Sequence, residues 1–210
     1  GLYQIAFPMT CFCDIPFSKV GSHMSLYGRY GIAFRKGSFI KKCHVQPIHY
    51  ITEESPLVKD FKQAFLEYFK SGEKTGKKDE VLKNYMVSTL LYMKPLSENK
   101  EIGGTITEYI YQDECEWRYI PTEKFPPNLK LILCKEANRR ATEPYSEALK
   151  NHQETWIKFD WEDVRYLIVP DESALHQIID VIAKLSISER EKYLLISKIE
   201  VSARFLEDLV

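Results

Sequence analysis

The sequence has no hydrophobic run that approaches the ~20 apolar residues of a membrane-spanning helix. It also has no excess of charge of either sign, since 29 Lys and Arg residues stand against 30 Asp and Glu residues, for a net charge of −1. A near-neutral balance gives no global sign of nucleic-acid or membrane binding, although it is compatible with local basic patches. We therefore expect a protein that does not interact with membranes.

The chain lacks a paired set of cysteines. Its five cysteines are scattered and odd in number, and no secretory segment is visible, which predicts reduced thiols in a cytoplasmic protein. Cys11 and Cys13 are separated by one residue, which is shorter than the usual ligand loop, and no second Cys/His pair follows at metal-like spacing. We expect no metal site.

What is present is enough apolar sequence for one globular domain. Apolar residues make up 44% of the 210, and neither a repeat nor a linker divides them, so residues 1–210 are expected to form a single domain. The chain starts at Gly1 without an initiator Met, which is consistent with a truncated N-terminus.

Helical periodicity and capping residues predict helices at residues 56–70, 79–93 and 172–184, and the tail is expected to end in a short helix at residues 203–209. Runs rich in β-branched and aromatic residues predict strands at residues 10–16, 30–34, 45–51, 129–134, 156–159, 165–169 and 193–201. Together they indicate an α+β fold with a mainly antiparallel, split sheet flanked by helices.

The stretch Tyr109–Pro121 is aromatic, β-branched and closed by a proline, which predicts one continuous strand. Strand side chains alternate, so one face would carry Glu114, Glu116 and Arg118, and the other Cys115, Trp117 and Tyr119. The charged face has two interpretations. It is either a solvated sheet face, with the guanidinium screening both acids, or a cleft in which one glutamate reacts.

A second candidate region is Tyr27-Gly-Arg-Tyr-Gly31. It lacks the glycine spacing and the Lys-Ser/Thr of a P-loop, which argues against a nucleoside triphosphate site. Tyr30, beside a glycine, could stack on a planar ligand or begin a buried strand. The basic residues around it could form a solvated loop or a contact with an anion or a nucleic acid. They are Arg29, Arg35, Lys36, Lys41 and Lys42.

Several strings of this sequence resemble the AbiGi-type abortive phage resistance family. They are Cys-Phe-Cys-Asp-Ile-Pro-Phe-Ser (11–18), His-Met-Ser-Leu-Tyr-Gly-Arg-Tyr-Gly-Ile-Ala-Phe (23–34), Asp-Glu-Cys-Glu-Trp-Arg-Tyr-Ile-Pro (113–121), Leu-Ile-Val-Pro (167–170) and the tail Leu-Ile-Ser-Lys-Ile (195–199). The resemblance covers most of the chain in order. It implies a phage-defence protein of the abortive-infection or toxin–antitoxin type, with a cognate toxin, antitoxin or chaperone as a partner.

The layout is also similar to DarT-like ADP-ribosyltransferases, which implies an ADP-ribosyltransferase-like fold and transfer of ADP-ribose from NAD⁺ to a nucleic acid (RNA or DNA) or a protein. The resemblance implies Glu116 as the catalytic acid and Glu114 as its helper. A carboxylate beside the ribose would stabilise the oxocarbenium character that builds as the nicotinamide bond breaks.

For NAD⁺ binding, the same resemblance implies Tyr30 or Tyr27 as the aromatic partner, with His23 and Arg118 as further contacts. The first element of such a site would lie upstream of Gly1. The alternative is a non-catalytic antitoxin or phage-sensing binding protein on the same fold. A nuclease is disfavoured, because the sequence has no cluster of acids or His pair of the kind used in metal-dependent cleavage.

Overall fold

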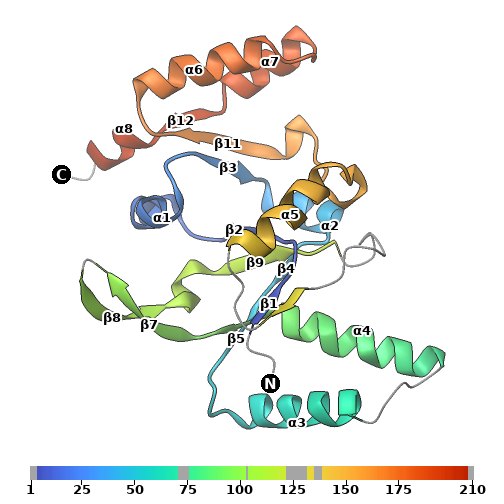
Figure 1. Cartoon of the computed structure of the whole chain (residues 1–210). Helices are drawn as coiled ribbons and strands as arrows, with labels where there is room; N and C mark the ends of the chain where they lie inside the picture. The colour runs from blue at the N-terminus through green and yellow to red at the C-terminus, as the bar shows by residue number, and fades with distance from the viewer. Residues whose placement is uncertain (1–3, 71–75, 103, 122–131, 135–138, 208–210) are drawn as a thin grey trace. The chain divides into compact units, whose positions relative to one another are not determined.

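The computed structural model describes residues 4–70, 76–102, 104–121, 132–134 and 139–207, and within these ranges the chain forms two compact units (Figure 1). Each unit is built from two stretches of sequence. The first unit comprises Gly1–Asp14 and Gln46–Trp156, and the second comprises Ile15–Val45 and Ile157–Val210. The single-domain expectation remains a prediction.

The first unit contains small sheets. Strand β9 (Glu116–Tyr119) lies between β2 (Thr10–Cys13) and β4 (Gln46–Pro47), and both pairings are antiparallel. The other strands pair two by two: β1 (Gln4–Ala6) with β10 (Ile132–Cys134), β5 (His49–Ile51) with β6 (Met93–Pro95), and β7 (Ser97–Ile102) with β8 (Thr105–Ile110). The pair of β5 and β6 is parallel, and Pro47 sits in an edge strand, as a residue without an N–H donor should.

Helices α3 (Pro56–Lys70), α4 (Lys77–Leu91) and α5 (Arg139–Lys150) complete the first unit. The start of α3 follows the predicted signal, since the Ser55 hydroxyl accepts a hydrogen bond from the Val58 N–H at 3.3 Å, and Pro56 occupies the first helical position. Helix α4 ends two residues earlier than predicted, and Met93 begins β6.

The second unit is built on the sheet β12–β11–β3. Strand β11 (Val164–Val169) pairs antiparallel with β3 (Gly31–Phe34) and parallel with β12 (Ile199–Val201). Its helices are α1 (Val20–Tyr27), α2 (Lys36–Cys43), α6 (Glu172–Ala183), α7 (Glu189–Ile196) and α8 (Ser202–Glu207). The parallel pairing arises because α6 and α7 form the crossover from β11 to β12.

The core of the second unit lies between this sheet and α6. Val169, Ala174 and Val201 are buried there, and Leu175 and Ile178 pack against them from α6. A second packed group involves α2, whose Phe39 stacks on Phe34 of β3 with 4.0 Å between the ring centroids. Phe159 contacts both rings edge-on.

The expected strand over Tyr109–Pro121 is wrong. Strand β8 ends at Ile110, a short 3₁₀ helix covers Tyr111–Glu114, and Cys115 adopts a left-handed conformation with φ 45° before β9 begins. The two strands have different partners, because β8 pairs with the adjacent β7 whereas β9 pairs with the distant β2 and β4. The turn redirects the chain, so that β8 and β9 pair in two different sheets.

Two other predicted strands are also wrong. Residues 156–159 form no strand, and Phe159 instead packs with Phe34 and Phe39. Of the predicted strand over residues 193–201, only Ile199–Val201 is extended, since Tyr193 lies in α7. Helix α7 starts with a capping box, in which Ser188 and Glu191 satisfy each other's backbone N–H groups.

The fold class is confirmed at a coarse level. The described part of the chain is a mixture of helices and small, mostly antiparallel sheets, with parallel pairs at β5–β6 and β11–β12. An ADP-ribosyltransferase fold remains a prediction.

Replacing Ser188 with Ala should lower the free energy of unfolding by about 1 kcal/mol, because the cap of α7 is lost. The matched control is Ser186→Ala, an exposed serine two residues earlier, which should change it by less than about 0.5 kcal/mol. Urea unfolding followed by circular dichroism measures both. Equal effects of the two substitutions would contradict the capping role.

Candidate functional site

The candidate site of the first unit is a buried cluster of charged side chains on β9. Glu116 and Arg118 alternate with Trp117 and Tyr119, as the strand pattern predicts, but the charged face is the buried one. Glu116 is 6% exposed and Arg118 is 7% exposed, whereas Trp117 and Tyr119 are half-buried. The interpretation of this face as solvated is therefore wrong.

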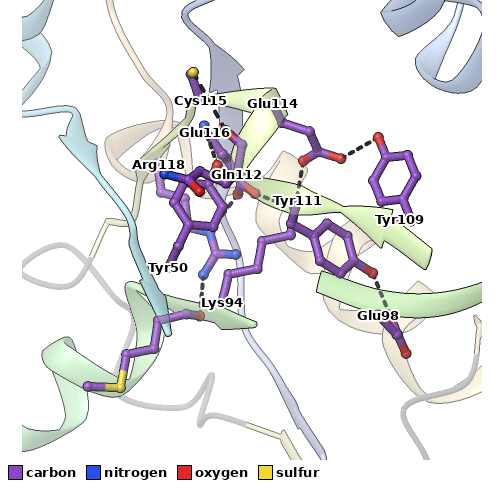
Figure 2. A network of polar contacts seen from close by, with 11 residues as sticks. Tyr50, Lys94, Glu98, Tyr109, Tyr111, Gln112, Glu114, Cys115, Glu116 and Arg118 are labelled. Carbon is purple, nitrogen blue, oxygen red and sulfur yellow. Dashed lines mark hydrogen bonds and ion pairs between the residues drawn. The ribbon is translucent and has the colours of Figure 1, made fainter. Parts of the chain in front are cut away.

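Lys94 of β6 joins the two glutamates (Figure 2). Its Nζ donates to Glu116 Oε2 and to Glu114 Oε2, each at 2.7 Å. Arg118 Nε donates to Glu116 Oε1 at 2.7 Å, and the Tyr109 hydroxyl donates to Glu114 Oε1 at 2.9 Å. Each of the four carboxylate oxygens therefore accepts a hydrogen bond from a neighbouring side chain.

The turn before β9 brings the two carboxylates together. In a continuous strand, residues two apart are spaced roughly 6.5–7 Å along one face. Here Glu114 ends the 3₁₀ helix and is itself 6% exposed, and its carboxylate reaches the same ammonium group as that of Glu116. The prediction that Glu114, Glu116 and Arg118 lie together is confirmed, although the local geometry differs from the one expected.

Backbone groups anchor the cluster to neighbouring elements. Arg118 Nη1 donates to the carbonyl oxygens of Leu91, at the end of α4, and of Met93, at distances of 2.5 and 3.4 Å. The Tyr50 hydroxyl of β5 accepts the backbone N–H of Glu116 at 2.7 Å, and the Glu116 carbonyl accepts the N–H of Ile48. The cluster thus links β9 to α4, β5 and β6.

The rings of Tyr109 and Tyr111 lie beside the charged cluster (Figure 2). Lys94 Nζ lies 4.2 Å from the ring centroid of Tyr111, and Lys100 lies over the rings of Tyr109 and Tyr111 at 4.3 and 4.5 Å. The Tyr111 hydroxyl donates to Glu98 Oε2 at 2.5 Å. These rings present their negative faces to the two ammonium groups, which is a stabilising arrangement.

The electrostatics keep the cluster ionised. Burial by itself raises the pKa of Glu116, but the hydrogen bonds from Arg118 and Lys94 outweigh it and hold the pKa below the ordinary value. Burial likewise lowers the pKa of Lys94, and the two glutamates reverse that effect and raise it. Cys11 lies next to this group, and burial together with the charge of Glu116 raises the pKa of its thiol to about 11.

The other predicted site residues lie in the second unit. Tyr27 and Tyr30 are 58% and 64% exposed, and the His23 ring packs against Tyr27 with centroids 4.5 Å apart. Their role in binding NAD⁺ remains a prediction. The interpretation of Tyr30 as the start of a buried strand is wrong, because β3 begins at Gly31 and Tyr30 is exposed.

Sequence reasoning missed Lys94, Tyr109 and Tyr50 as members of the cluster. Lys94 did carry a signal, since it is a single charge within the otherwise apolar run Leu90-Leu-Tyr-Met-Lys-Pro-Leu96. A charge in such a run is expected to have a buried partner of opposite sign. The partners could not be identified from the sequence, because they are 20 and 22 residues away.

The arrangement fits a structural ion cluster. Among the described residues, no group of three or more His, Cys, Asp or Glu side chains could hold a metal ion. A ligand that approached Glu116 would meet a residue that is 6% exposed and whose carboxylate already accepts hydrogen bonds of 2.7 Å from Lys94 and Arg118. Removing one partner from a buried ion pair costs about 3–5 kcal/mol.

Comparison with known sequences places the chain in the class of abortive phage resistance proteins. It belongs to the AbiGi family, whose model, described as "Putative abortive phage resistance protein AbiGi, antitoxin", matches residues 2–170. The chain is also 27% identical over 222 aligned residues to the "Abortive phage resistance protein AbiGi" of Lactococcus lactis subsp. cremoris, an alignment that covers 96% of this chain and 88% of the relative. The family predicted from the sequence strings is confirmed.

No solved structure matches the chain, so the predicted DarT-like layout has no structural relative in its support. None of the helices within the described ranges combines the length and the apolar character needed to cross a membrane.

Replacing Lys94 with Met should lower the free energy of unfolding by about 3–5 kcal/mol, because two buried carboxylates lose their shared cation. Lys100→Met is the matched control. It removes a lysine that contacts the same tyrosine rings without a described carboxylate partner, and should cost at most about 1 kcal/mol. Urea unfolding measures both, and a loss in Lys94→Met no larger than in the control would contradict the role of Lys94.

Acid should destabilise the protein partly through Glu116. Because its folded pKa lies below the ordinary value of 4.5, its contribution to stability is present above that pH and is lost as the pH falls through the lower folded value. Urea unfolding between pH 6 and pH 3 should therefore show a shallower loss of stability in Glu116→Gln than in the unmodified protein. Glu101→Gln, in the exposed hairpin, is the control and should keep the original slope.

Proposed function

We propose that this protein acts in abortive phage resistance as the antitoxin of a toxin–antitoxin pair, and that it works by binding its toxin. The family description, which names an antitoxin, supports this proposal. The observation that carries it is the burial of Glu114 and Glu116 within ion pairs, because a catalytic acid must contact its substrate, whereas these residues are each 6% exposed and their carboxylates contact protein donors.

Further support comes from the surface of α3 and α4 in the first unit. Helix α3 has a strongly one-sided pattern of apolar residues, yet none of its residues is fully buried. The exposed apolar side chains of the two helices are Leu57, Leu66, Phe69, Val81, Leu82 and Tyr85. An apolar surface of this kind on a folded chain is typical of a protein-binding site, and the proposed occupant is the toxin.

The second candidate function is ADP-ribosyl transfer from NAD⁺ to a nucleic acid or protein. One observation favours it: although burial raises the pKa of Glu116, the neighbouring Arg118 and Lys94 lower it, so this buried carboxylate keeps the charge that stabilisation of an oxocarbenium ion requires. In this case NAD⁺ would have to reach a carboxylate that is buried and paired with Lys94 and Arg118. Access would require opening the buried ion cluster, which is why the antitoxin role is preferred.

The antitoxin role is tested by co-expression with a candidate toxin, defined as a protein of the same phage-resistance system that arrests growth. The protein should relieve the growth arrest that this candidate toxin causes when expressed alone, and the two should co-purify. A double variant, Val81→Ser and Tyr85→Ser, should weaken co-purification at least tenfold, because it removes two exposed apolar side chains from α4. Ile106→Ser, at an exposed apolar position on the β7–β8 hairpin, is the matched control. Growth arrest that persists during co-expression would overturn the proposal.

The two candidate functions are separated by incubating the purified protein with labelled NAD⁺. The antitoxin role predicts no release of nicotinamide and no labelled acceptor, both for the unmodified protein and for Glu116→Gln. Release that is lost in Glu116→Gln, while the variant keeps its circular dichroism spectrum, would establish the transferase in its place.

A further inference from the structure

A segment of the second unit carries positive charge without any acidic residue. Between Ile15 and Val45 there are six Lys and Arg residues and no Asp or Glu, although Asp and Glu make up 30 of the 210 residues of the chain. The segment folds into α1, β3 and α2, and the two helices lie at opposite ends of β3 (Figure 1). All six basic side chains are exposed: Lys19, Arg29, Arg35, Lys36, Lys41 and Lys42.

Part of this charge is neutralised by the rest of the unit. Lys42 forms ion pairs with Asp160 and Asp163, and Arg29 lies 3.6 Å from Asp171. Arg35 donates its Nε hydrogen to the backbone carbonyl of Glu162. Because a carbonyl oxygen carries no net charge, this hydrogen bond does not neutralise the guanidinium. Within the described ranges, no ion pair with a carboxylate involves Arg35 or Lys41.

Two tyrosine rings belong to residues just before β3, at the end of the strand opposite to Arg35 and α2. Tyr27 and Tyr30 are both more than half exposed, and Gly28 between them has a φ of 120°, a backbone conformation that favours glycine. The edge of β3 away from β11 has no partner strand among the described residues. The edge strand β3 therefore separates the two tyrosines from Arg35 and α2, and its four residues span about 13 Å.

We propose that Tyr27 and Tyr30, before β3, and Arg35 and Lys41, after it, bind single-stranded nucleic acid. Positive side chains attract the phosphates, and exposed aromatic rings stack on unpaired bases, which is how proteins without sequence preference hold single strands. The bases of a duplex are stacked on each other and do not offer their faces to tyrosine rings. This inference is independent of the antitoxin role, because its residues belong to the second unit and the apolar surface of α3 and α4 belongs to the first.

The test measures fluorescence anisotropy of labelled 20-nucleotide oligo-dT, oligo-U and a DNA duplex with the full chain at 50 mM NaCl. One or both single strands should bind at least tenfold more tightly than the duplex, and the comparison of oligo-dT with oligo-U distinguishes DNA from RNA as the ligand. Tyr30→Ala should weaken binding about 5- to 100-fold. Tyr193→Ala is the matched control, since Tyr193 on α7 is 69% exposed and should leave the affinity unchanged.

The phosphate contact is tested by salt titration. Lys41→Gln should reduce the slope of log affinity against log salt concentration by about 0.7, the value of one phosphate contact on a single strand. Lys184→Gln, an exposed lysine at the end of α6, should keep the original slope.

Three outcomes would overturn the proposal. They are no anisotropy change with either single strand, equal weakening by Tyr30→Ala and Tyr193→Ala, and binding to anionic phospholipid vesicles that depends on Tyr30 in the absence of oligonucleotide binding.

Discussion

The ion pairs of Glu116 with Arg118 and Lys94 are the constraint on which the first unit depends. Charges in a low-dielectric interior are stable only when each meets an opposite charge and its remaining hydrogen-bonding groups are satisfied. Here Arg118 also binds the carbonyl at the end of α4, and Lys94 also binds Glu114. Because no member can leave without exposing a partner to an apolar environment, the cluster fixes α4, β6 and β9 relative to one another.

The two units expose different kinds of side chain, and each suits a different kind of partner. In the first unit, Glu114 and Glu116 lie in buried ion pairs, and the exposed apolar side chains of α3 and α4 are the proposed contact for a protein partner. In the second unit, the acid-free segment of α1, β3 and α2 exposes rings and cations that suit a nucleic acid. A chain with a net charge of −1 can hold both surfaces, since local patches are independent of the overall balance.

The sequence strings identify the family, whereas the structure shows what surrounds Glu116. The strings at residues 11–18, 23–34 and 113–121 led to the correct family, because strings of that length and order do not arise from composition alone. They did not decide the role of Glu116. A Glu-x-Glu pair on a strand is compatible with a reactive carboxylate and with a buried ion pair, and the difference lies in what surrounds the pair.

The sequence by itself determined the features that rest on local interactions. The start of α3 at Ser55-Pro56, the start of α6 after Asp171 and the alternation of Glu116 with Trp117 follow from caps and periodicity within a few residues. Only the tertiary structure decided which face of β9 is buried, because Lys94 and the Leu91 carbonyl come from a distant part of the chain. The break at Cys115 was decided in the same way, since the different partners of β8 and β9 override a local preference for extended backbone. The helix over residues 189–196, by contrast, has a local signal in the sequence, the Ser188–Glu191 capping box, which the strand prediction overlooked.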